Sequence, residues 1–184
     1  VLPAAIANAG ANQYVCSNEF TMPGTPTTIG TGTWTYESGA GTLLFADIND
    51  ANTEMSGLTP GIHVFKWTIT GNDICNSGVF DYVTLIYEDP SISIAKTRCQ
   101  PNTENYDVIV IIADGSLYSV SEGVVGAINE YTTISTIDSS AQLQVIAVST
   151  GNCRDTTLIN APACPDCVPI CLPVNSMLRR GEKE

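Results

Sequence analysis

Hydrophobic and polar residues alternate with a period of two in short runs along most of the chain. The longest run, residues 62–70, places Phe65, Trp67 and Ile69 on one side of an extended strand. Turns rich in glycine, proline and asparagine separate the runs, and no stretch keeps a period of 3.6 residues. The sequence therefore predicts an all-β protein. The expected strands cover residues 13–20, 31–36, 42–46, 62–70, 81–87, 91–99, 106–112 and 143–147.

The inward face of these strands is rich in aromatic and branched apolar side chains. Side chains two positions apart point to the same side of a strand, so each run contributes one face to a core. Two tryptophans compete for the central core position, one in residues 31–36 and one in residues 62–70. The expected core residues are Trp34, Phe65, Trp67, Ile69, Tyr106, Val108, Val110 and Val145.

Seven cysteines divide into two widely spaced pairs and a cluster near the end of the chain. They are Cys16, Cys75, Cys99, Cys153, Cys164, Cys167 and Cys171. The members of the first pair are 59 positions apart and those of the second are 54 positions apart. The inward face of residues 62–70 continues in register to Cys75, and that of residues 143–147 continues to Cys153. We therefore expect disulfides between Cys16 and Cys75 and between Cys99 and Cys153, each worth roughly 4 kcal/mol on the chain-entropy model.

These features predict two tandem immunoglobulin-like β-sandwich domains, each with one intradomain disulfide. We expect the first domain over residues 1–90 and the second over residues 91–163. Residues 88–91 combine two acidic residues, a proline and the start of a new alternation, which indicates a domain junction. Residues 164–184 are expected to form a cysteine- and proline-rich connector and the start of a further segment. The odd number of cysteines leaves one thiol for a bond outside this stretch.

The charge balance and the cysteines indicate where the protein is found. Seven basic residues stand against 19 acidic ones, a net charge of −12, which opposes binding to nucleic acid. No apolar run reaches the length of about 18 residues that a membrane-spanning helix needs, so membrane insertion is not expected. Expected disulfides indicate an oxidising compartment. The sequence therefore predicts an extracellular, cell-surface location.

Candidate catalytic chemistry is sparse. His63 is the single histidine, so any mechanism with a histidine base would depend on it. It stands at the beginning of the strand over residues 62–70, where we expect a position at the surface or at a sheet edge. No serine or cysteine in a nucleophile motif accompanies it. We therefore expect no enzyme activity and no cofactor.

Two clusters resemble metal sites only in part. The spacing of Cys164, Cys167 and Cys171 would supply three zinc ligands or a redox pair, but structural disulfides are the favoured interpretation. Asp47, Asn49 and Asp50 gather oxygen ligands in one loop, as a calcium site does. Their spacing departs from the calcium-loop pattern, so a solvated loop is favoured and no metal is expected.

Several segments resemble repeats of a known group of surface proteins. In the first half these are residues 9–13 before Cys16, residues 30–34 and residues 57–69; in the second half they include Tyr106 and residues 151–153. They are similar to tandem PKD-like and Ig-like repeats of giant cell-surface proteins of Bacteroidetes, which include gliding-motility adhesins and other cargo of the type IX secretion system. The second half has no tryptophan, a departure from the immunoglobulin pattern. The resemblance implies a segment of a long, secreted fibre, with no catalytic residues to carry over.

The function expected from these observations is structural and adhesive. Two rigid, disulfide-stapled modules would act as a spacer in a repeat-built surface fibre, with neighbouring domains of the same chain as partners. One alternative is a filament subunit whose terminal segment adds a strand to the next copy. Another is a module that binds surface glycans or a calcium-dependent ligand.

Overall fold

The computed structural model describes residues 5–71, 78–101, 103–129 and 131–163, and all regular elements in these ranges are strands. The strands are β1 (Gln13–Val15), β2 (Glu19–Thr21), β3 (Thr31–Ser38), β4 (Gly41–Phe45), β5 (Glu54–Leu58), β6 (Gly61–Thr70), β7 (Val79–Tyr87), β8 (Ser91–Cys99), β9 (Asn105–Ala113), β10 (Ser116–Val120), β11 (Val124–Val125), β12 (Thr132–Asp138), β13 (Leu143–Val148) and β14 (Arg154–Ile159). In the described part of the chain, no helix is long and apolar enough to cross a membrane.

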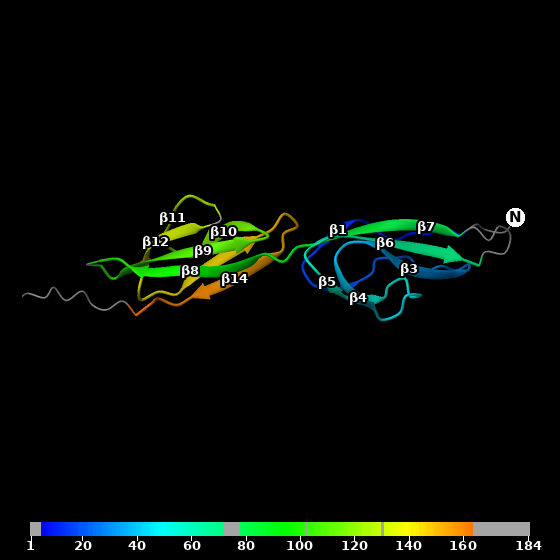
Figure 1. The fold of residues 1–184 in the computed structure, drawn as a ribbon, viewed down its shortest axis with the longest axis horizontal. Helices are drawn as coiled ribbons and strands as arrows, with labels where there is room; N and C mark the ends of the chain where they lie inside the picture. The colour runs from blue at the N-terminus through cyan, green and yellow to red at the C-terminus, as the bar shows by residue number, and fades with distance from the viewer. Residues whose placement is uncertain (1–4, 72–77, 102, 130, 164–184) are drawn as a thin grey trace, which may run out of the picture.

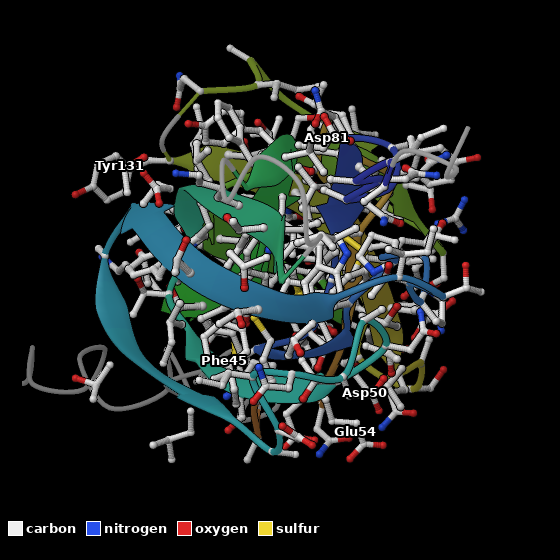
Figure 2. The ribbon with its side chains drawn as sticks, turned by 90° about the vertical axis from the view of Figure 1, so that its right-hand side faces the viewer. Phe45, Asp50, Glu54, Asp81 and Tyr131 are labelled. Carbon is white, nitrogen blue, oxygen red and sulfur yellow. A yellow bond between two sulfur atoms is a disulfide. The ribbon has the colours of Figure 1, made fainter. Side chains whose placement is uncertain are left out.

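The first half of the chain forms two sheets that face each other across one core. One sheet has the order β1-β7-β6-β3 and the other has the order β2-β5-β4. All pairings are antiparallel except that of β1, which runs parallel to β7. We call this pair of sheets, with its loops through residue 90, the N-terminal sandwich. Seen end on in Figure 2, Phe45, Asp50 and Glu54 lie on the side of β4 and β5, and Asp81 lies on the opposite side.

The second half repeats this plan with a core of its own. Its sheets have the orders β11-β12-β9-β8 and β10-β13-β14. Tyr106, Val108 and Val110 of β9 pack in the same apolar cluster as Leu143 and Val145 of β13. The two clusters share no residue, so each pair of sheets closes around its own apolar interior. Residues 91–163 are called the C-terminal sandwich below.

The two sandwiches follow one another along the long axis of the molecule (Figure 1). β7 ends at Tyr87 and β8 begins at Ser91, so only residues 88–90 connect them along the backbone. Because this connection is short, the end of β7 and the beginning of β8 must lie close together. The loop between β13 and β14 approaches the same place (Figure 1).

The core of the N-terminal sandwich is built around two tryptophans. Trp34 of β3 and Trp67 of β6 are paired across the sheet, and their ring centroids are 5.0 Å apart. Both side chains are almost fully buried, and the Trp34 indole N–H donates to the Ala51 carbonyl at 3.2 Å. Gly32 lies against the Trp67 ring, where a Cβ atom would clash. The remaining expected core residues Phe65, Ile69, Tyr106, Val108, Val110 and Val145 are also buried.

We predict that Trp67→Ala lowers the free energy of unfolding by about 3–5 kcal/mol, because it removes a large buried ring and leaves a cavity. Urea unfolding followed by tyrosine fluorescence would measure the loss. The matched control is Phe80→Ala on the neighbouring strand β7, where the ring is 55% exposed and the expected change is below about 1 kcal/mol. Equal losses in the two variants would contradict the assignment of Trp67 to the core.

Candidate functional site

The junction between the sandwiches is the candidate functional site, because a covalent bond and several hydrogen bonds meet there. Its backbone connection, residues 88–90, ends in Pro90, which fixes one backbone angle and favours an extended conformation for the residue before it. Pro90 is buried, and its ring lies so close to Gly115 that a side chain at Gly115 would meet it. The linker is therefore held against the C-terminal sandwich.

A disulfide between Cys16 and Cys153 crosses this junction. Cys16 follows β1, and Cys153 precedes β14. The Cα atoms are 5.2 Å apart, although the two residues are 137 positions apart in the sequence. The expected pairs Cys16 with Cys75 and Cys99 with Cys153 are both wrong, because Cys16 and Cys153 bond to each other. The bond joins the two sandwiches instead of stapling either one.

The physical reason for this error lies in what strand alternation can indicate. Alternation predicts which face of a sheet a residue shares, and Cys153 is indeed buried. It does not predict at which end of the sandwich a residue lies. Cys16 and Cys153 both lie at the junction, where Cys16 is exposed and Cys153 is buried. Cys99 is also disulfide-bonded, while Cys75, Cys164, Cys167 and Cys171 lie outside the described residues.

The carboxylate of Glu88 reinforces the covalent bond. Its Oε2 atom accepts hydrogen bonds from the Ser149 hydroxyl at 2.5 Å and from the Gly151 N–H at 2.6 Å. The same Ser149 hydroxyl accepts from the Cys153 N–H at 3.2 Å. On the other side, the Glu88 N–H donates to the Val15 carbonyl at 3.0 Å. One linker residue thus ties β1 of the first sandwich to the β13–β14 loop of the second, through a backbone hydrogen bond on one side and two charge-assisted hydrogen bonds on the other.

The β13–β14 loop has a shape that fits this contact. Asn152 adopts a left-handed backbone conformation with φ of 69°, and its N–H donates to the Ser149 carbonyl. Gly151 lies directly against Tyr14 of β1, where an added Cβ atom would come within 2.5 Å of the Tyr14 Cβ. The absence of a side chain at Gly151 therefore lets the two sandwiches approach each other closely.

His63 is not at the surface or at a sheet edge, contrary to the expectation. It is fully buried in β6, a central strand of its sheet. Its Nε2 atom lies 2.7 Å from the Thr59 carbonyl oxygen, which can only accept, so Nε2 carries a proton. Its Nδ1 atom lies 3.1 Å from the hydroxyl of Tyr36, and burial raises the pKa of that hydroxyl. Both ring nitrogens therefore lie at hydrogen-bonding distance from oxygen atoms of neighbouring residues.

The oxygen-rich loop after β4 stabilises turns and covers β3. Asp47 accepts a hydrogen bond from the Asn49 N–H, and Asp50 accepts one from the Asn52 N–H. The Asn49 amide donates to the Gly32 carbonyl at 2.8 Å. Among the described residues, no group of three or more histidine, cysteine, aspartate or glutamate side chains is arranged to hold a metal ion.

Two further exposed features lie on the N-terminal sandwich. A hollow of about 660 Å³ over β2, β4 and β5 has Glu19 and Glu54 in its lining, which makes it acidic. On the outer side of β6 and β7, the rings of Phe80 and Tyr82 are 5.5 Å apart, and the Lys66 ammonium lies 4.7 Å from the centre of the Phe80 ring. We call Lys66, Phe80 and Tyr82 the aromatic surface.

Comparison with known proteins finds likeness in structure only. No family model and no curated protein matches the sequence. Among solved structures, the chain is similar to the PKD domain from KIAA 1837 protein, with 20% identity, a TM-score of 0.40, and coverage of 48% of this chain and 91% of that one. It is also similar to protocadherin gammaB7 EC3-6, with 12% identity, a TM-score of 0.32, and coverage of 84% of this chain and 45% of that one. The third structure is that of the tandem Ig repeats of Dlar, with 12% identity, a TM-score of 0.27, and coverage of 85% of this chain and 95% of that one.

We predict that Gly151→Ala loosens the junction, because its methyl group would collide with Tyr14. Hydrogen exchange of the Ser149 to Cys153 amides should speed up by at least tenfold, while exchange in the cores of both sandwiches stays slow. The matched control is Gly126→Ala, where the nearest contact of an added Cβ atom is an ordinary 3.4 Å to the Thr133 carbonyl. Unchanged exchange in Gly151→Ala would show that the close approach does not hold the junction together.

Proposed function

We propose that the chain is a structural and adhesive module that acts as a rigid, disulfide-linked spacer in a secreted, repeat-built surface fibre. It comprises an Ig-like or PKD-like domain over residues 1–90, a second Ig-like domain over residues 91–163 and a cysteine- and proline-rich connector over residues 164–184. The sequence resemblance to repeats of Bacteroidetes surface proteins supports the place in a fibre. The neighbouring domains of such a fibre are the proposed partners.

The observation that carries this proposal is the junction. A free linker between domains allows relative motion by default. Here a three-residue connection, a covalent bond and the Glu88 hydrogen bonds act at one place. Together they remove the freedom of the two sandwiches to bend or rotate about each other. A spacer needs this property, because its reach depends on a fixed angle between its parts.

Two further observations support the domain organisation and the location. Each sandwich has a separate apolar cluster, as expected of units that fold around their own cores. Disulfides persist in oxidising compartments, and the Cys16–Cys153 bond and the bonded Cys99 therefore support a secreted, extracellular protein. The net charge of −12 favours solubility and mutual repulsion between copies.

Relaxation of backbone amides by NMR tests the rigid spacer. In the oxidised chain, both sandwiches are expected to tumble with one common correlation time, as a single elongated body. In a Cys16→Ser/Cys153→Ser variant the two correlation times should separate, because three hydrogen-bonded contacts alone do not hold the angle. Independent tumbling of the two sandwiches in the oxidised wild-type chain would exclude the spacer role.

The aromatic surface favours glycan binding as a second candidate function. Two neighbouring rings on an outer sheet face offer a platform on which the C–H faces of sugar rings can stack. Phe80 is 55% exposed and Tyr82 is 45% exposed, and Lys66 adds a hydrogen-bond donor beside them. Aromatic residues left exposed in this way often mark a binding surface.

A panel of oligosaccharides titrated against the chain by NMR tests this candidate. Shifts are expected for residues of β6 and β7, and Phe80→Ala/Tyr82→Ala should weaken binding by at least tenfold. Tyr118→Ala is the matched control, since Tyr118 is also an exposed aromatic residue, at 61%, but stands on β10 of the other sandwich. A spectrum that no sugar of the panel changes would remove glycan binding from consideration.

A further inference from the structure

The Cys16–Cys153 bond creates a second, shorter covalent path through the molecule. Along the backbone, a route from residue 5 to residue 163 passes through both sandwiches. Through the disulfide, the route runs along residues 5–16, crosses the bond and continues along residues 153–163. Residues 17–152, which include β2 through β13, form a closed loop beside this route.

The first part of the route runs beside β7 and parallel to it. The Ala9 N–H donates to Asp81 at 2.9 Å, and the Asn12 side chain accepts from the Thr84 N–H at 2.7 Å. In β1, Gln13 is paired with Leu85 in parallel. All these contacts join residues 72 positions apart (81 − 9, 84 − 12 and 85 − 13). Residues 9–15 therefore follow β7 in one unbroken register toward the junction.

The second part of the route continues away from the junction. β14 starts directly after Cys153 and pairs with β13 along its full length, from Arg154 with Val148 to Ile159 with Leu143. In Figure 1 this strand leads from the junction toward the far end of the C-terminal sandwich. Residues 9–15 and 154–159, which make up most of the route, run along neighbouring strands, and extended chain spans at most about 3.3–3.6 Å per residue. They therefore have little length left to give when pulled.

We propose that the Cys16–Cys153 disulfide is a cross-link that transmits tension from one sandwich to the other. When the chain is pulled through the segments before Cys16 and after Cys153, tension passes along the short covalent route, and residues 17–152 stay folded because no force acts across them. This inference rests on the proposed spacer function and gives it a mechanism. It makes the module nearly inextensible without requiring that the hydrogen bonds of either sandwich resist the pull.

The second bonded cysteine does not change the route. Cys99 lies inside the loop of residues 17–152. A bond from inside the loop cannot shorten the path between Cys153 and the later residues, whichever cysteine it joins. The Cys16–Cys153 bond alone therefore decides which residues carry the load.

Single-molecule force spectroscopy on the full chain, held by handles at both ends, tests the proposal. The oxidised chain is expected to stretch without releasing the loop. After reduction, unfolding steps should release the loop, with a total gain in contour length of about 450–490 Å for 137 residues. The Cys16→Ser/Cys153→Ser variant should show unfolding steps under oxidising conditions as well. Reduction of the folded wild-type chain keeps the test valid if this variant does not fold.

Cys99→Ser is the matched control, because it removes another bonded cysteine but leaves the cross-link intact. It should stretch like the oxidised wild type. Release of the full loop length from the oxidised wild-type chain would overturn the role of the disulfide in transmitting tension, and so would equal extension before and after reduction. The spacer proposal is judged separately by the tumbling of the unpulled chain, so the two can fail independently.

Discussion

The closure of the chain at the junction is the constraint on which the arrangement of the whole molecule depends. On the chain-entropy model, a cross-link across 137 positions removes about 5 kcal/mol of freedom from the unfolded chain. That stabilisation is shared, because the bond closes a loop through both sandwiches. When one half unfolds, the closed loop becomes partly unfolded, and this changes the loop entropy that stabilises the other half. The two cores are separate, but their stabilities are coupled.

Hydrogen bonding at the junction depends on the same closure. A partly buried carboxylate such as Glu88 needs hydrogen-bond donors, and the Ser149 hydroxyl and the Gly151 N–H of the β13–β14 loop supply two of them. The disulfide holds that loop in place, so its donors are already in position to bind the Glu88 carboxylate. The contact between Gly151 and Tyr14 also depends on the disulfide. Their close packing is favourable only while the two surfaces stay aligned.

Much of the fold could be predicted from alternation, because long half-buried strands such as β6 and β9 carry a strong period-two pattern. The expected strands leave out β5, β10, β11, β12 and β14, which have two to seven residues each and carry a weaker alternation. The expected strand over residues 13–20 is interrupted, because the chain leaves one sheet at Val15 and joins the other at Glu19. The surroundings of His63 and the pairing of Cys16 at the junction were harder to predict. The burial of His63 depends on Tyr36 and Thr59, and the bond of Cys16 depends on how two sandwiches meet, which no local pattern encodes.

The loop over residues 47–52 has a consequence for how copies of this protein meet. Besides the Asn49 amide bond to Gly32, the Ile48 carbonyl accepts from the Trp34 N–H at 2.8 Å, so the loop occupies backbone groups on the outer edge of β3. At the opposite edge of that sheet, β1 offers only three residues. Open sheet edges invite pairing with another chain, and capped or short edges suppress it. Where many such modules are crowded together, this loop protects the N-terminal sandwich from lateral aggregation.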